Sequence, residues 1–208
     1  MAYFPFFVDI KNKNCLVVGG GKVALRKIEK LVPFGPIIKV VSPEVCNEIS
    51  NMKDLTIELR KFNDGDIDDA DFVISATDDK QLNCHIYDLC SKKSILVNTV
   101  DDKENCSFIF PALVNKDNIT AAVSTGGKSP LTASYIRKRI ESIIDSNLSE
   151  TVEVLGAIRD DIKCEIKTEE QRKQFYQWVL DKSLKEKINI KTEHSKLLIK
   201  EFKEQNEN

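Results

Sequence analysis

The chain contains 208 residues, of which 41% are hydrophobic and 31% are charged. This length and apolar content suffice for one ordinary domain with an extension, or for two small domains. The 31 basic and 33 acidic residues nearly balance, and the net charge of −2 argues against a nucleic-acid-binding protein. No apolar run is long enough to span a membrane, and the first residues lack the pattern of a signal peptide. We therefore expect a cytoplasmic protein without a membrane partner.

The cysteines and histidines provide little material for a metal centre. The six cysteines form no CxxC pair, and several lie inside apolar runs, where a thiol acts as a small hydrophobic side chain. With no secretion signal, they are expected to stay reduced. His85 and His194 are far apart in the sequence. Neither a metal site nor catalysis by a Ser–His or Cys–His pair is therefore expected.

A glycine-rich stretch near the N-terminus has the pattern of a dinucleotide-binding turn. An apolar run at 15–18 predicts a buried strand, residues 22–31 have helical periodicity, and three glycines connect the two. Glycines let a diphosphate approach the backbone, and the helix start offers N–H groups and a positive dipole. The pattern G-x-G-x-x-A beginning at Gly19 matches the dinucleotide fingerprint. We predict a nucleotide site here; the alternative is a glycine turn without a ligand.

The segment after the second expected strand bears on the choice of cofactor. An apolar run at 37–41 predicts this strand, and Glu44 follows it about 20 residues after the glycines. In the fingerprint an acid at this distance binds the ribose hydroxyls, which favours NAD over NADP. An alternative, compatible with the first, is that Ser42 caps a helix whose first position is Pro43.

Further apolar runs predict an α/β fold with a Rossmann-type parallel sheet. Strands are expected at 55–59, 71–77 and 94–98, with a helix from about 80 to 91 between the last two. Ligands of such sheets bind beyond the carboxyl ends of the strands. The aromatic residues at 3–7 are expected to cover the sheet from its edge. The predicted cofactor-binding residues are Gly19, Gly20, Gly21, Lys22, Val23, Pro43, Glu44, Thr77, Asp78 and Asn98.

The pattern of the chain changes after the last of these strands. Extended runs at 107–114 and 119–124 flank a polar turn, which predicts a β-hairpin. A second glycine loop then opens a helix, with Ser129 as its cap and Pro130 at its first position. The rest of the chain is helical and increasingly polar. The predicted regions are a Rossmann domain at 1–104, a hairpin-and-helix dimerisation region at 105–146 and a small helical C-terminal domain at 147–208.

Several motifs follow one another over most of the chain up to about residue 145. They are FPFF from Phe4, VVGGGKVALRK from Val17, ATDD from Ala76, VNTVDD from Val97, SFIFPA from Ser107 and VSTGGKSP from Val123. In this order they resemble the motifs of the precorrin-2 dehydrogenases. That family includes the N-terminal module of sirohaem synthases and its stand-alone relatives.

The resemblance implies a specific reaction and assembly. The reaction would be NAD-dependent oxidation of precorrin-2, a tetrapyrrole polycarboxylate, to sirohydrochlorin in sirohaem or cobalamin biosynthesis. The assembly would be a homodimer in which the hairpin and the following helix exchange between subunits. Some relatives also insert metal into sirohydrochlorin, so chelation is a second activity that the resemblance allows.

The resemblance also points to residues for catalysis and substrate binding. The family's catalytic aspartate falls on Asp101 by the match of VNTVD, and Asp101 would act as a base or an orienting group. On turn chemistry alone, Asp101 could instead be a cap or turn residue. The substrate carboxylates need N–H donors and positive charge. The predicted substrate-binding residues are Ser124, Thr125, Gly126, Gly127 and Lys128.

Two other functions are compatible with parts of the sequence. A nucleotide-sensing regulatory domain without chemistry also uses a Rossmann unit, although it does not explain the hairpin or the second glycine loop. A chelatase without dehydrogenase activity would insert metal into sirohydrochlorin and would not need NAD.

Overall fold

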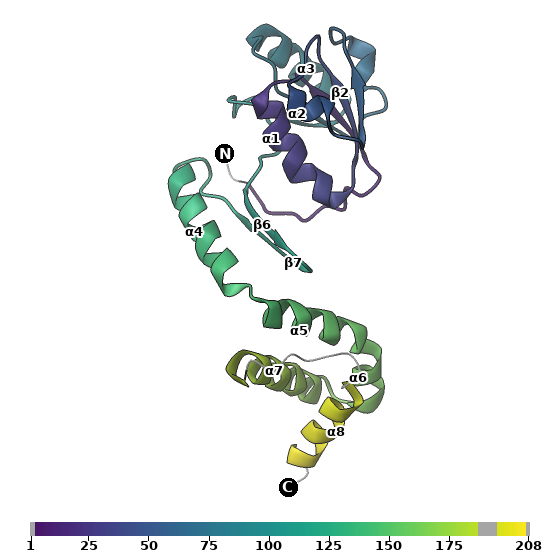
Figure 1. Cartoon of the computed structure of the whole chain (residues 1–208), viewed down its shortest axis with the longest axis vertical. Coiled ribbons are helices and arrows are strands. Elements are labelled where there is room, and N and C mark those ends of the chain that lie inside the picture. The colour runs from purple at the N-terminus through teal and green to yellow at the C-terminus, as the bar shows by residue number, and fades with distance from the viewer. Residues whose placement is uncertain (1–2, 187–194, 207–208) are drawn as a thin grey trace. The chain divides into compact units, whose positions relative to one another are not determined.

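The computed structural model describes residues 3–186 and 195–206 and divides the chain into two compact units (Figure 1). One unit is Phe4–Ile109, and the other comprises Met1–Tyr3 and Phe110–Asn208. None of the described helices is long and apolar enough to cross a membrane.

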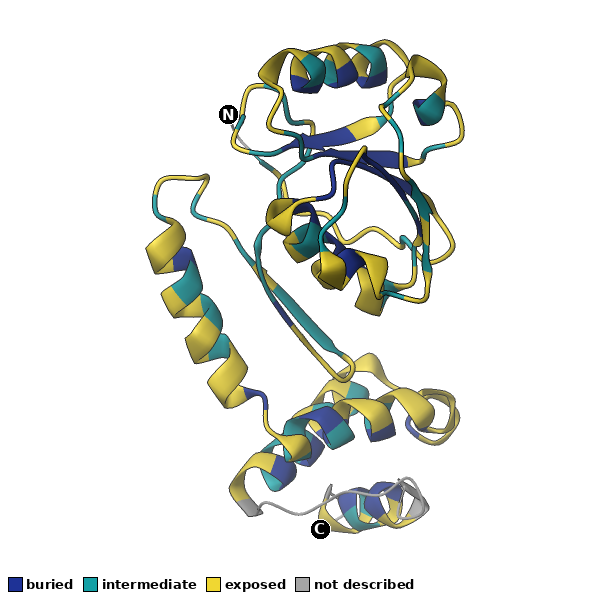
Figure 2. Ribbon diagram, turned by 45° about the horizontal axis from the view of Figure 1, so that its top comes forward, coloured by how far each residue is buried: buried dark blue, intermediate teal, exposed yellow. Residues whose placement is uncertain are grey.

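The first unit contains a five-stranded parallel sheet with the strand order β3-β2-β1-β4-β5. Helices lie on both faces of this sheet (Figure 2). The α/β fold and the parallel sheet predicted from the sequence are therefore confirmed. The strands are β1 (Asn14–Val18), β2 (Ile37–Val41), β3 (Leu55–Glu58), β4 (Phe72–Ser75) and β5 (Leu96–Thr99); the helical elements are α1 (Lys22–Leu31), η1 (Val32–Phe34), α2 (Asn47–Ser50), η2 (Asp64–Ile67) and α3 (Lys80–Lys92).

The central strand β1 creates the crevice in which such folds bind ligands. It pairs with β2 on one side and with β4 on the other, so the connections run in opposite directions from it. This is the topological switch point of an open α/β sheet, and the adjacent loops at the carboxyl ends form the ligand edge. The glycine turn after β1 lies at this point.

Burial of apolar side chains fixes the sheet and the helices on it. Residues 15–18 of β1 are at most 2% exposed, and α1 buries Ala24, Ile28 and Leu31 on one face. The other face of the sheet has its own cluster, which comprises Leu16, Val18, Val41, Ile67, Val73, Ile86, Cys90 and Val97. Burial raises the pKa of the Cys90 thiol to about 11, so it stays a neutral part of this core.

Two expectations about the first unit are wrong. The N-terminal aromatic residues do not cover the sheet, because Phe4, Phe6 and Phe7 are each at least 75% exposed. Ser42 does not cap a helix: α2 begins at Asn47, and the Ser42 hydroxyl instead donates to the Glu44 carbonyl oxygen at 2.6 Å. This bond closes a tight turn that delays the helix.

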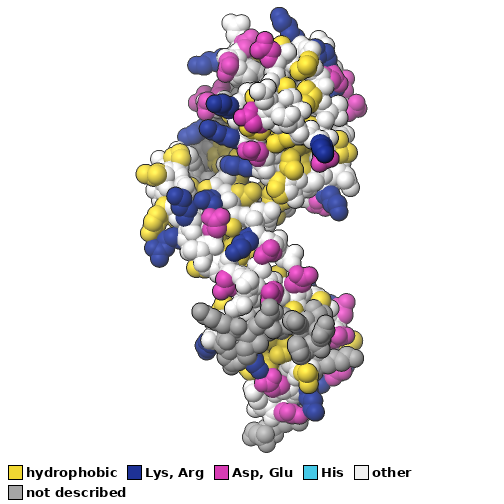
Figure 3. All heavy atoms as spheres, in the orientation of Figure 1, with side chains coloured by type: hydrophobic (Ala, Val, Ile, Leu, Met, Phe, Trp, Pro, Cys, Tyr) yellow, Lys and Arg dark blue, Asp and Glu magenta, His cyan; other side chains and the backbone are white. Residues whose placement is uncertain are grey.

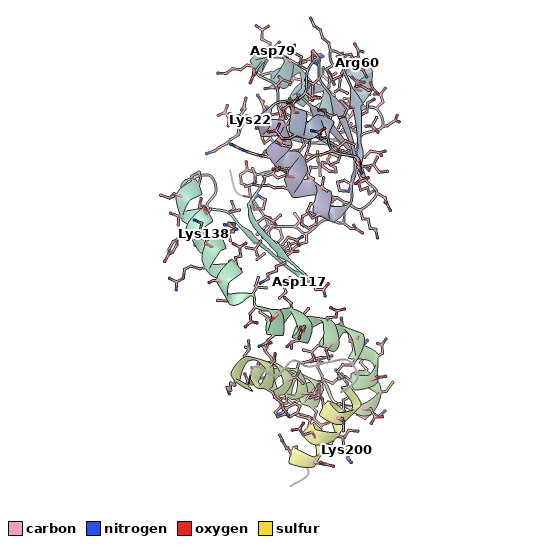
Figure 4. The ribbon with its side chains drawn as sticks, in the orientation of Figure 1. Lys22, Arg60, Asp79, Asp117, Lys138 and Lys200 are labelled. Atoms are coloured by element: carbon pink, nitrogen blue, oxygen red, sulfur yellow. The ribbon has the colours of Figure 1, made fainter. Side chains whose placement is uncertain are left out.

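The second unit begins with the predicted hairpin, β6 (Ala112–Lys116) and β7 (Ile119–Val123). Asp117, labelled at its tip in Figure 4, has φ +53, which its short polar side chain tolerates. The first strand is shorter than expected, since it starts at Ala112 instead of residue 107. α4 (Pro130–Ile143) follows with the predicted cap, because the Ser129 hydroxyl accepts from the Thr132 N–H at 3.2 Å.

The remaining described chain is helical, as predicted: α5 (Ser146–Ala157), α6 (Arg159–Glu165), α7 (Glu169–Glu186) and α8 (Ser195–Asn206). Phe175 on α7 is fully buried, and its ring packs edge-on against Phe202 of α8 at 5.3 Å between centroids. Tyr176 and Trp178 pack against the same cluster. The apolar residues Ile188 and Ile190 lie outside the described part of the chain.

Candidate functional site

The first two glycines of the turn after β1 are required by packing. Gly19 has φ +113, and a Cβ there would lie 2.2 Å from the Ala76 carbonyl oxygen. A Cβ on Gly20 would lie 2.1 Å from the Glu44 carbonyl oxygen. Both distances are far inside van der Waals contact. The loops after β2 and β4 therefore close on the turn from both sides.

Gly21 has a different environment. Its φ is −83, and a Cβ there would meet no atom within 4 Å. It is the N-cap of α1 without a side-chain capping bond, and among the described residues the N–H groups of Lys22 and Val23 have no hydrogen-bond acceptor. Figure 4 shows Lys22 at this helix start. Open space in front of unpaired N–H groups at a helix N-terminus fits a phosphate, so these residues fit a dinucleotide.

The loop after β2 packs over the glycine turn. The Cys46 N–H donates to the Gly20 carbonyl oxygen at 2.8 Å, which holds the loop in place. Pro43 and Glu44 have exposed side chains, and the Glu44 backbone lies against Gly20. The structure therefore brings the predicted acid beside the glycines.

The loop after β4 is held by an asparagine that the sequence analysis missed. The Ser75 and Thr77 hydroxyls each lie 2.7 Å from the Asn83 side-chain oxygen, and the Asn83 amide donates to the Thr77 carbonyl oxygen at 2.9 Å. Asn83 is 6% exposed. The Thr77 side chain is thus engaged inside the protein, whereas Asp78 is exposed. A signal existed in the sequence: Asn83 shares the inner face of α3 with Ile86 and Cys90.

Replacement of Asn83 by Leu should destabilise the protein by about 1–3 kcal/mol, because it leaves the buried Ser75 hydroxyl without its acceptor. Loosening of the Thr77 turn, which borders the glycines, should also weaken NAD binding about fivefold, equivalent to roughly 1 kcal/mol. Thermal melts and NAD titrations would measure both effects. The control is Gln81→Leu, an exposed position on the same helix. Equal NAD affinities for the two variants would contradict the positioning role.

The two aspartates after β5 differ in their surroundings. The Asp102 carboxylate accepts from the Asn105 amide at 2.8 Å and from the backbone N–H groups of Glu104 and Asn105. These bonds, that of the Asn105 side chain foremost, hold the pKa of Asp102 below its usual range. Asp101 is exposed, has φ +59, and makes no hydrogen bond or ion pair within the described part of the chain. Asp102, and not Asp101, therefore makes the side-chain hydrogen bonds that stabilise this turn. The Asp101 carboxylate is left without a hydrogen bond to the described residues.

Asn98, on the same strand, is almost completely buried. Its amide nitrogen donates to the Phe108 carbonyl oxygen at 2.9 Å. Its side-chain oxygen and the Thr99 hydroxyl are buried and have no partner among the described residues. A buried polar atom without a hydrogen-bond partner costs free energy. The Asn98 side-chain oxygen and the Thr99 hydroxyl are two such atoms, and both lie at the carboxyl end of β5.

Lys27 is a basic residue near Asp101 that sequence reasoning did not select. Burial lowers the pKa of its ammonium group, and Lys30 acts in the same direction, whereas the charge of Asp101 raises it. The helix α1 therefore contributes a half-buried cation to the neighbourhood of Asp101. A signal for Lys27 existed in the sequence, since it lies about one helical turn after Ala24, the last residue of the glycine pattern.

The second glycine loop belongs to the second unit. Gly126 and Gly127 have φ +60 and +74. Three of the loop's N–H groups are already bonded internally: Gly126 to the Ser124 hydroxyl, Lys128 to the Thr125 carbonyl oxygen, and Ser129 to the Thr125 hydroxyl. The exposed Lys128 side chain leaves a positive charge for an anion. No group of three or more His, Cys, Asp or Glu side chains suited to a metal occurs in the described residues.

Comparison with known proteins identifies the first unit. A family model described as "Putative NAD(P)-binding" matches residues 6–112, just over half of the chain. The chain belongs to this NAD(P)-binding family. A second model, described as "Sirohaem biosynthesis protein central", matches residues 120–143, which include most of β7 and all of α4.

Curated relatives of this NAD(P)-binding protein extend the likeness to nearly the whole chain. The siroheme synthase of Thioalkalivibrio sulfidiphilus is 41% identical over 184 residues, which are 87% of this chain and 38% of that protein. The siroheme synthase of Pseudoalteromonas atlantica is 36% identical over 191 residues, which are 90% and 41%. The chain thus spans about 40% of the length of these relatives. The resemblance inferred from the motifs is confirmed.

A solved structure shares the complete fold. The structure named "SirC, precorrin-2 dehydrogenase" superposes with a TM-score of 0.73 and covers 97% of this chain and 100% of its own. The sequence identity is 23%, so this likeness concerns the fold. The hairpin and the helical region are therefore parts of a fold already known.

Proposed function

We propose that this protein is a dehydrogenase that uses NAD to oxidise precorrin-2 to sirohydrochlorin. One observation carries the proposal: the dinucleotide turn with its open position at Gly21 and the Asp101 carboxylate follow strands of one sheet at its carboxyl edge. The names of the similar proteins, siroheme synthase and precorrin-2 dehydrogenase, agree with this substrate.

The chemistry requires the loss of two hydrogens from the substrate. One leaves with its electron pair as a hydride, for which bound NAD supplies the acceptor, and the other leaves as a proton. The protein's residues hold and orient the reactants: Gly21, Lys22 and Val23 bind the diphosphate, and Glu44 binds the ribose hydroxyls, which selects NAD over NADP. Asp101 accepts the proton or orients the carbon that loses it.

Substrate recognition is assigned to the loop of the second unit. Precorrin-2 is a polycarboxylate, so its binding needs positive charge and N–H donors. Ser124, Thr125, Gly126, Gly127 and Lys128 are proposed to contact these carboxylates, with Lys128 as the main cation. We also propose three regions: residues 1–104 hold the cofactor, residues 105–146 join the subunits, and residues 147–208 form the helical C-terminal domain. The protein is proposed to be cytoplasmic.

The decisive experiment mixes the purified protein with precorrin-2 and NAD under anaerobic conditions. The proposal predicts stoichiometric NADH and the absorbance of sirohydrochlorin. NAD binding without either product would favour a nucleotide sensor. Metal insertion into supplied sirohydrochlorin without NAD dependence, and no NADH, would favour a chelatase.

A homodimer is proposed because α4 exposes apolar side chains that a monomer would leave in water. Leu131 is 84% exposed, Tyr135 58% and Ile143 68%, and basic side chains lie among the apolar ones on this helix (Figure 3). Such a surface suits an interface between two copies. The variant Leu131→Asp should shift the protein from dimer to monomer in sedimentation analysis. Leu59→Asp, at a leucine 67% exposed in the other unit, is the control and should stay dimeric.

A further inference from the structure

The loop that carries Asp101 is closed at its base. Residues 99–106, the aspartate loop, leave β5 and return beside it, since Asn98 and Cys106 form an antiparallel bridge. The Val100 N–H donates to the Ser75 carbonyl oxygen at 2.9 Å, which extends the sheet into the loop. Asp101 therefore follows an anchored residue and begins the exposed part of the loop.

The Cys106 thiol lies at the centre of this loop. Its sulfur accepts from the Thr99 N–H at 3.2 Å and lies 3.5 Å from the Asn98 amide nitrogen. The Asp102 and Thr99 carbonyl oxygens, at 2.9 and 3.1 Å, are both within reach of its single S–H proton. The thiol thus contacts the backbone on both sides of Asp101, two residues before it and one residue after it.

The protonated thiol suits this role. Burial raises the pKa of Cys106, an effect that the Thr99 N–H and Lys27 oppose and the Asp102 charge supports. A neutral thiol both donates and accepts hydrogen bonds, whereas a thiolate could not donate to the carbonyl oxygens. The contacts with donors and acceptors therefore belong to the protonated form.

We propose that Cys106 is a positioning residue for Asp101, whose thiol holds the two sides of the aspartate loop so that the carboxylate faces the substrate. Asp101 has φ +59, in the left-handed region, which few non-glycine residues adopt but which Asp tolerates. The contacts of the Cys106 thiol with Thr99 and Asp102 hold the backbone on both sides of this residue. The inference rests on the proposed catalytic role of Asp101 and adds the residue that orients it.

The test compares Cys106→Ala with Cys106→Ser, which differ only in a hydroxyl that can donate and accept. Cys106→Ala should lower kcat about 10- to 100-fold, because small displacements of a reacting group have effects of this size. NAD affinity should change less than about twofold, which is under 0.5 kcal/mol. Cys106→Ser should recover most of the lost kcat. The control Cys90→Ala removes a buried core thiol on α3 and should lower the melting temperature without this selective loss of kcat.

Several outcomes would overturn the inference. One is a Cys106→Ala enzyme with undiminished kcat, and another is a Cys106→Ser enzyme as impaired as Cys106→Ala. If Cys106→Ala does not fold, the isosteric pair Cys106→Val and Cys106→Thr decides the matter in the same way. The Asp101→Asn variant, assayed in parallel, separates the catalytic role of Asp101 from the positioning role of Cys106. If Asp101→Asn is inactive and Cys106→Ala is fully active, only the positioning role is rejected. A fully active Asp101→Asn rejects both roles, as would a wild-type protein without turnover.

Discussion

Replacement of Asp101 by Asn should lower kcat for precorrin-2 oxidation by about 10²- to 10⁴-fold, the range for loss of a general acid or base. Asn is the appropriate substitution because it keeps the shape of Asp and also tolerates the left-handed conformation that this position requires. The fold and the glycine turn should be unaffected. NAD affinity, measured by titration, should stay close to that of the wild type.

The neighbouring aspartate provides a matched control. Asp102→Asn weakens the bonds to the Glu104 and Asn105 N–H groups, so it should lower stability more than Asp101→Asn does. Its kcat should exceed that of Asp101→Asn. If the two variants exchanged these behaviours, Asp102 would be the catalytic group. Equal, undiminished activity in both would place the proton acceptor elsewhere.

Replacing the glycines of the β1–α1 turn by Ala, one at a time, should affect NAD binding at one position and stability at the other two. Gly21→Ala should weaken NAD binding about 10- to 100-fold, because its Cβ fills the space expected for a phosphate and displaces charge-assisted bonds worth about 1.5–3 kcal/mol each. Its melting temperature should change little, since φ is −83 and no protein atom lies within 4 Å of the added carbon.

The same change at Gly19 or Gly20 should act on the fold. Each added carbon would lie about 2 Å from a backbone carbonyl oxygen, so Gly19→Ala and Gly20→Ala should lower the free energy of unfolding by about 3 kcal/mol or more. Circular dichroism melts and NAD titrations on all three variants make the comparison. A Gly21→Ala protein that binds NAD normally would mean that the diphosphate lies elsewhere.

Much of the fold was predictable because it follows from local pattern. Apolar runs and the helical periodicity after Gly21 predicted β2 and α1 at the bounds observed, and β1 with its start one residue late. The hairpin and the Ser129 cap followed from turn and capping chemistry, which acts between near neighbours. Local pattern failed at Ser42, where capping chemistry was read as a helix start although the hydroxyl closes a turn.

Other features depend on contacts that form only in the folded chain, whether the partners are near or far in the sequence. The exposure of Phe4 was not predictable, because aromatic composition indicates burial and only the packed sheet shows whether a surface remains to be covered. Asn83 was missed because its partners, Ser75 and Thr77, precede it on another element. Cys106 was not singled out among the six cysteines, and only its contacts with Thr99 and Asp102 distinguish it from the core thiols.

By itself, the sequence determined the class of this protein: an α/β chain with a dinucleotide turn and acids after successive strands. These properties depend on residue type and spacing, which the sequence states directly. The tertiary structure decided which of these residues are available. It distinguished Gly21 from two glycines confined by carbonyl groups, and Asp101 from an Asp102 bonded within its own turn. The physical reason is that availability depends on which other groups approach an atom in the folded chain, whether they come from a distant loop, as at Gly19, or from the same turn, as at Asp102.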